Sequence, residues 1–185
     1  DLGVGQEPLV GIIARLSDVK GHIYLIRAMK KVIARFASVK LLIIGEGKMK
    51  EILIKEVETL DIKNNILFIP EARVNQELLA AMDIFVMPSL QEGLGLALME
   101  AMAQGLAVIG SRVGGIKTLI QDAVNGLLVE PADVEGLTAA ITRLLDDSNL
   151  RRSLGASARK FIIDNFSKEK MVDTTEKVYK KCLEK

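Results

Sequence analysis

The chain has 185 residues, of which 49% are hydrophobic and 4% aromatic, with no Trp. Its 25 Lys and Arg against 24 Asp and Glu give a net charge of +1, a balance that offers no positive field for binding nucleic acid or a membrane surface. Because single cores run to about 100–200 residues, one domain accounts for this length.

Cysteine content and hydropathy bear on the compartment. The one cysteine, Cys182, cannot form an internal disulfide, so we expect a reducing, cytoplasmic location, with peripheral attachment to a membrane in a longer protein as a further option. No run of about 18 apolar residues occurs, so no integral membrane segment is expected. Residues 1–8 lack signal-peptide features and are typical of an interdomain linker. We therefore expect 1–185 to be a single domain, with 1–8 as a linker remnant and 166–185 as a terminal helix.

Short apolar runs alternate with helical patterns along the chain. Six runs predict buried strands: Leu9–Ala14, Lys40–Ile44, Ile66–Ile69, Ile84–Met87, Ala107–Gly110 and Gly126–Val129. Between them the apolar spacing predicts helices over Gly21–Ala37, from Gly47 to about Leu60, and over Gln76–Met82, Leu94–Gln104 and Gly115–Gln121. From Pro131 onward the pattern is helical, with breaks near Ser148 and Asn165.

Strands that alternate with helices at this spacing indicate right-handed βαβ units. The predicted fold class is α/β: a Rossmann-like three-layer α/β/α sandwich with a six-stranded parallel sheet and extra C-terminal helices. In such sheets ligands bind beyond the carboxyl ends of the strands, so the loops that follow strands are the places to look for chemistry.

The loop after the first strand carries Arg15 and Lys20 and leads into a helix. Arg offers a planar fork of donors and Lys a point charge, and both suit phosphate oxygens. The alternative is a pair of solvated surface cations.

The loop after the fourth strand carries Gly93 and Gly95 before the next helix. Glycines at such a turn allow close backbone approach by a ligand, and the start of the helix suits a diphosphate. Glu100 lies about five residues into that helix, roughly 7–8 Å along its axis, where a carboxylate could accept hydrogen bonds from a ribose. Glu92 would face the sugar on the other side of the phosphates. The alternatives are a helix-capping role for Glu92 and a solvated position for Glu100.

The loop after the fifth strand ends in the glycine pair Gly114 and Gly115. A glycine pair permits either close approach of a ligand or an ordinary tight turn.

Other site classes find little support. The G-x-G segments at Gly45 and Gly93 lack the third glycine of the dinucleotide fingerprint, which disfavours a nicotinamide dehydrogenase, and no G-x-x-x-x-G-K-[ST] loop occurs. His22 and Cys182 form no metal-ligand cluster or nucleophile–base arrangement, and Ser89 lacks the G-x-S-x-G elbow. No metal or other cofactor is therefore expected.

Taken in chain order, these segments resemble the C-terminal domain of the retaining, family 4 (group 1) glycosyltransferases of GT-B architecture. The family patterns G-R-L…K-G, I-x-G-x-G, P-S-x-x-E-G-F-G-x-x-x-x-E-A-M-A, G-x-P-V-I…V-G-G and N-G-L-L-V are matched over nearly the whole chain, at Ala14–Gly21, Ile43–Gly47, Pro88–Ala103, Gly105–Gly115 and Asn125–Val129. Ala14, Leu94 and Ala107 replace the usual Gly, Phe and Pro, changes that affect packing more than charge.

The resemblance implies a role for each candidate residue. Arg15 and Lys20 would neutralise the donor diphosphate, Glu92 would contact hydroxyls of the donor sugar, and Glu100 would bind the ribose. The remaining donor-binding positions that it implies are the phosphate-contacting backbone of Gly93, Leu94, Gly95 and Leu96, the base-facing loop around Arg73, and the cleft border at Val113 and Gly114.

The implied reaction transfers a sugar from a nucleoside-diphosphate sugar to an acceptor hydroxyl with retention, and two cations with a helix dipole can stabilise the leaving diphosphate without a metal. The family's N-terminal, acceptor-binding domain is absent, so we expect this chain alone to be inactive. The alternatives are a sugar-nucleotide epimerase or hydrolase lobe, or a non-catalytic nucleotide-binding module of the same fold. Neither the base, the sugar nor the acceptor follows from these residues.

The C-terminal tail has apolar residues at helical spacing among many lysines, namely Met171, Val172, Val178 and Leu183. In the resembled architecture the last helix often crosses back toward the N-terminal domain. An apolar stripe on this helix also allows oligomers to form through it.

Overall fold

One sheet of six parallel strands organises the chain. The structure is a computed structural model that describes residues 7–70 and 76–183. The strands are β1 (Leu9–Ile13), β2 (Lys40–Ile44), β3 (Ile66–Ile69), β4 (Ile84–Met87), β5 (Ala107–Ser111) and β6 (Leu127–Val129). Their order is β3-β2-β1-β4-β5-β6, and every neighbouring pair is parallel, which confirms the predicted sheet.

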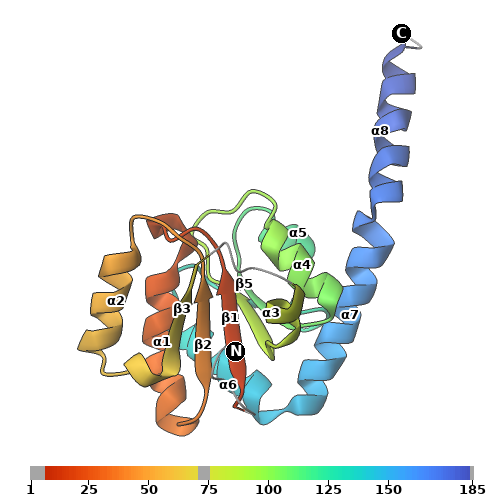
Figure 1. Ribbon diagram of the computed structural model, residues 1–185. Helices are drawn as coiled ribbons and strands as arrows, with labels where there is room; N and C mark the ends of the chain where they lie inside the picture. Colours follow the sequence, from red (N-terminus) through yellow and green to blue (C-terminus); the bar gives the residue numbers. More distant parts are fainter. Residues whose placement is uncertain (1–6, 71–75, 184–185) are drawn as a thin grey trace.

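Helices cover both faces of the sheet (Figure 1). One face is covered by α1 (His22–Arg35), α2 (Lys50–Thr59) and α6 (Val134–Asp146). The other is covered by α3 (Gln76–Ala80), α4 (Leu96–Gln104), α5 (Ile116–Leu119) and α7 (Ser148–Phe166), and α8 (Lys168–Leu183) follows α7. Short 3-10 turns occur at Asp18–Lys20 and Lys63–Asn65. The three-layer α/β/α prediction is thus confirmed.

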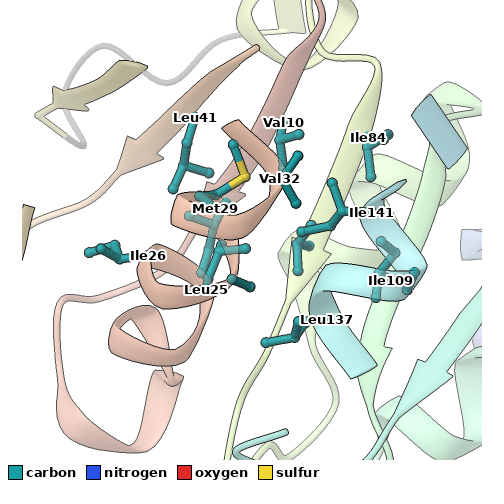
Figure 2. Packing of buried hydrophobic residues seen from close by; sticks show 14 of the residues in the cluster. Val10, Leu25, Ile26, Met29, Val32, Leu41, Ile84, Ile109, Leu137 and Ile141 are labelled. Atoms are coloured by element: carbon teal, nitrogen blue, oxygen red, sulfur yellow. The ribbon is translucent and has the colours of Figure 1, made fainter. Parts of the chain in front are cut away.

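The strands supply alternate side chains to two apolar cores, as the twofold period of extended chain requires. In β1, for example, Val10 and Ile12 pack in the core under α1 and α6, whereas Leu9 packs in the opposite core. Figure 2 shows the first core, where residues of α1 such as Leu25 and Met29 meet strand residues and α6. Strands buried on both faces explain the nearly continuous apolar runs in the sequence.

The predicted start of α4 at Leu94 is wrong by two residues. Gly95 is in the left-handed conformation, with φ of 77°, and the helix begins at Leu96. The spacing of apolar residues could not reveal this helix start, because Leu94 and Leu96 are both apolar. The left-handed backbone of Gly95 between them is not visible in such a pattern.

The order of the strands places a topological switch between β1 and β4. The chain leaves β1 toward β2 on one side of the sheet, whereas β4 pairs with β1 on the other side and continues to β5. Connections that leave in opposite directions open a crevice above the carboxyl ends of the two strands, which is where ligands bind in this class of sheet. The loops after β1 and β4 are the ones that carry Arg15, Lys20 and Glu92.

Helix α8 projects away from the sheet (Figure 1). None of its side chains is buried, and Met171, Val172, Val178, Tyr179 and Leu183 are each more than half exposed. Oligomer formation through this helix stays a prediction. Among the described helices, none is long and apolar enough to cross a membrane.

Candidate functional site

Backbone contacts join the strand-exit loops at the switch point. The amide of Leu90, after β4, donates to the carbonyl of Val19, after β1, at 2.8 Å. The amide of Leu16 donates at 2.8 Å to the carbonyl of Glu46, in the loop after β2. Gly21 lies so close to the Pro88 carbonyl that an added Cβ would sit 1.9 Å from that oxygen. Loops that are remote in sequence therefore have a defined mutual position.

A cavity of about 480 Å³ opens between these loops and the start of α4. Five predicted site residues line it, namely Arg15, Lys20, Glu92, Gly95 and Leu96, together with Ile13, Ala14, Ser17, Val19, Met87 and Ala97. The other predicted donor-binding residues are not part of its lining: Gly93, Leu94, Glu100, Val113 and Gly114. Arg73 lies in the segment 71–75, outside the described residues.

Lys20 and Glu92 form an ion pair in the wall of this cavity. Lys20 Nζ donates to Glu92 Oε2 at 2.7 Å, and the side chains are 23% and 11% exposed. The hydroxyl of the fully buried Ser89 donates to the same oxygen at 3.3 Å. Because both partners use Oε2, Glu92 Oε1 has no described partner and can accept a hydrogen bond from a ligand. The alternative of a helix-capping role for Glu92 is wrong, since the N-cap of α4 is Gly95 and no side chain caps it.

Arg15 is the second cation at the cavity. Its side chain is exposed, and it forms no ion pair or hydrogen bond with any residue in the described ranges 7–70 and 76–183. A guanidinium without a partner, next to an ammonium that is only singly paired, gives the cavity an unbalanced positive charge. Such an arrangement suits an anion with several oxygens.

The start of α4 adds backbone donors to the same cavity. The first amides of a helix have no intrahelical acceptor, and α4 has neither a capping side chain nor an acidic residue in its first turn. Gly95 and Leu96, where the helix starts, line the cavity. The positive end of this helix is thus available to a bound anion.

Glu100 is the fifth residue of α4 and lies on its exposed face, opposite the buried Leu98, Ala101 and Met102. At about 1.5 Å per residue it is about 6 Å along the axis from the first residue. Its carboxylate makes no hydrogen bond or ion pair within the described part of the chain. Glu100 is therefore accessible to a ligand that extends outward from the cavity.

The glycine pair after β5 packs on protein backbone. A Cβ on Gly114 would lie 1.9 Å from the Glu92 carbonyl oxygen, and one on Gly115 would lie 1.9 Å from that of Gly93. The amide of Gly115 also donates to the Glu92 carbonyl at 3.2 Å. These contacts give the pair a packing role behind the Glu92 loop. Ligand contact by Gly114 or by the half-buried Val113 stays a prediction.

Sequence reasoning missed Ser89 as part of the site. The sequence pattern bore on this residue only as a possible nucleophile, whereas in the structure its hydroxyl donates a hydrogen bond to the Glu92 carboxylate. Its place three residues before Glu92, and two residues after a buried strand, was the available signal. No group of three or more His, Cys, Asp or Glu side chains within the described ranges is placed to hold a metal ion.

Comparison with known proteins gives a consistent result. Residues 2–161 match the family model for "Glycosyl transferases group 1". The chain is 35% identical over 180 residues to the N-acetyl-alpha-D-glucosaminyl L-malate synthase of Bacillus anthracis. The alignment covers 97% of this chain but only 47% of that enzyme. The chain thus spans about half the length of this relative.

Two solved structures are also similar. The complex of S. aureus TarM with fondaparinux, alpha-GlcNAc-glycerol and UDP superposes with a TM-score of 0.88 at 28% identity, over 94% of this chain and 35% of TarM. The C-terminal domain of a group 1 glycosyltransferase from Francisella tularensis gives a TM-score of 0.80 at 28% identity, over 87% of each chain. With the family match, the parallel sheet and the cavity at its switch point, the chain belongs to the group 1 glycosyltransferases of GT-B architecture and corresponds to their C-terminal domain.

Proposed function

We propose that the cavity between β1 and β4 binds the diphosphate of a nucleoside-diphosphate sugar, and that the chain is the donor-binding domain of a transferase that retains the anomeric configuration. One observation carries the proposal: a single cavity is surrounded by Arg15, which has no partner among residues 7–70 and 76–183, by Lys20, whose one described partner is Glu92, and by the uncapped start of α4. Three sources of positive potential converge there. The presence of UDP in the related TarM complex supports the same class of ligand.

In this proposal each residue acts on a different part of the donor. Arg15, Lys20 and the first amides of α4 bind the diphosphate and stabilise the negative charge that develops when the bond to the sugar breaks. Glu92 accepts hydrogen bonds from sugar hydroxyls through Oε1, while Lys20 and Ser89 hold its other oxygen. Glu100, about one turn along α4, accepts hydrogen bonds from the ribose. No cofactor is required by this scheme.

Glu100→Ala tests the ribose assignment. We expect UDP, GDP or ADP, whichever binds the wild-type chain, to bind about 10-fold more weakly, because a hydrogen bond to a charged group contributes about 1.5–3 kcal/mol. Isothermal titration of the 185-residue chain measures the change, and the crystallised Francisella domain indicates that such domains can be studied alone.

Two controls sharpen that titration. Glu58→Ala removes an exposed carboxylate of α2 and should leave the affinity unchanged. A 2′,3′-dideoxyribose analogue should bind the wild type and the Glu100 variant equally, because it has no hydroxyls to lose. A Glu100→Ala variant that binds the ribonucleotide as well as the wild type contradicts the assignment. If no nucleoside diphosphate binds the wild type at millimolar concentration, the donor-site proposal fails, and a non-catalytic module becomes the better reading.

We further propose that the chain by itself does not transfer sugar. An acceptor-binding, N-terminal half is expected in the whole protein, since this chain spans 47% of its Bacillus relative. Half a site can bind donor but cannot bring an acceptor hydroxyl to the anomeric carbon. Incubation with labelled nucleotide sugars should release no sugar above the uncatalysed rate. Turnover by the isolated chain would show that catalysis does not need the N-terminal half. Such a result would also favour the hydrolase alternative.

A further inference from the structure

His22 is buried directly behind the candidate donor site. It is the first residue of α1 and follows Gly21, whose left-handed conformation, with φ of 70°, turns the chain into the helix. Its side chain is 2% exposed. The residues before it, Ser17, Val19 and Lys20, line the cavity. His22 thus lies in the layer beneath the phosphate-facing loop and not on its surface.

The imidazole is polar but poorly hydrogen-bonded. Among the described residues, the Ser17 backbone acts on it as a hydrogen-bond acceptor, but neither Nδ1 nor Nε2 makes a hydrogen bond of normal geometry. A buried donor or acceptor without a partner costs stability, whereas an apolar group of the same shape does not. If the only task at position 22 were to fill the core, Phe would fill it at lower cost. The two ring nitrogens therefore call for a role beyond packing.

The ring is electrostatically linked to Lys20. Burial and, to a lesser extent, the nearby Lys20 ammonium lower the pKa of His22 to about 4, and a hydrogen bond to the Ser17 backbone acts in the opposite sense. Lys20 is the ionisable neighbour whose charge acts on the ring. The imidazole is therefore neutral at physiological pH, with one nitrogen that can donate and one that can accept.

We infer that His22 is a positioning residue for Lys20: its polar ring lies beneath the Ser17–Lys20 turn and holds this turn in the arrangement in which Lys20 meets the diphosphate. The inference rests on the proposed function. Lys20 Nζ donates to Glu92 at 2.7 Å, so the ammonium is held on one side by Glu92 and on the other by the turn that carries it. A contact that favours one arrangement of the turn raises the affinity of a ligand that binds this arrangement.

His22→Phe separates this role from packing. We expect the melting temperature of the free chain to stay the same or rise, since a buried and poorly hydrogen-bonded polar ring is replaced by an apolar one, while the affinity for the nucleoside diphosphate falls about 10-fold. His22→Gln and His22→Asn place an amide nitrogen near the positions of Nε2 and Nδ1, respectively. At least one of them should recover most of the affinity and so identify the nitrogen involved.

Recovery by an amide is the second readout, because a residue that only fills the core would not regain affinity through a polar substitute. Full affinity in His22→Phe overturns the inference and leaves His22 as a core residue. If the Phe variant does not fold, loss of binding in both folded amide variants overturns it as well. Failure of the wild type to bind any of UDP, GDP or ADP instead refutes the proposed function, and this inference falls with it.

Discussion

Replacing Lys20 by Met weakens the binding of UDP, GDP or ADP by about 100-fold, the largest loss that we expect from a single side chain at this site. The ammonium is in the cavity wall, 23% exposed, where water screens its charge less than at the surface. Hydrogen bonds between ionised groups are about twice as strong as neutral ones, so the loss of one to a diphosphate is worth about 2–3 kcal/mol. Titration calorimetry at fixed ionic strength measures the change.

The Lys20–Glu92 pair makes a double variant informative. Lys20→Met leaves the 11% exposed Glu92 carboxylate without its cation, and we expect this to lower the free energy of unfolding by about 1–2 kcal/mol. Lys20→Met/Glu92→Gln removes the unpaired charge and should recover stability but not affinity. Lys55→Met, on the exposed surface of α2, is the matched control and should change neither. Nucleotide affinity that survives in Lys20→Met would place the diphosphate elsewhere.

Gly21→Ala lowers the free energy of unfolding by about 3 kcal/mol. The left-handed conformation costs a non-glycine residue about 1–2 kcal/mol. In addition, the new Cβ would lie 1.9 Å from the Pro88 carbonyl oxygen, a backbone atom that cannot rotate away. Relief of this clash requires the loop after β4 to move from the loop after β1. Urea-induced unfolding followed by circular dichroism measures the loss.

Gly93→Ala is the control for this substitution. Its Cβ would meet no atom within 4 Å, and its φ is not positive, so the free energy of unfolding should change by less than about 0.5 kcal/mol. Reduced nucleotide affinity in this stable variant would support the predicted approach of the Gly93 backbone to the phosphates. Equal stability of the Gly21 and Gly93 variants would mean that the two loops are not held together by this close contact.

Much of the site was open to prediction because its residues follow strands. A strand-exit position can be recognised from a short apolar run, and cations or glycines after it indicate a ligand. Arg15, Lys20, Glu92 and Gly95 were named on this basis, and Leu96 was implied by the family resemblance. The structure brings all five to one cavity. Their roles toward a nucleotide sugar remain predictions, as do those of Gly93, Leu94, Glu100, Val113 and Gly114.

What stayed out of reach depends on contacts between distant segments. Lys20 and Glu92 are separated by 72 residues, and nothing in either loop shows that they pair. The sequence allowed either ligand contact or a tight turn for the glycine pair after β5. The structure shows that Gly114 and Gly115 pack against the backbone of Glu92 and Gly93. His22 likewise stayed out of reach, because nothing in the sequence shows that its ring is buried beneath the loop that carries Lys20.

The sequence by itself determined the class of fold, the strands and the family, because apolar periodicity and short motifs are local and are read one segment at a time. Only the tertiary structure decided which charges neutralise one another, which glycines pack on backbone and where α4 begins. The physical reason is that pairing energies and close contacts depend on distances across the switch point of the sheet. Those distances are set by the packing of two cores rather than by any one segment.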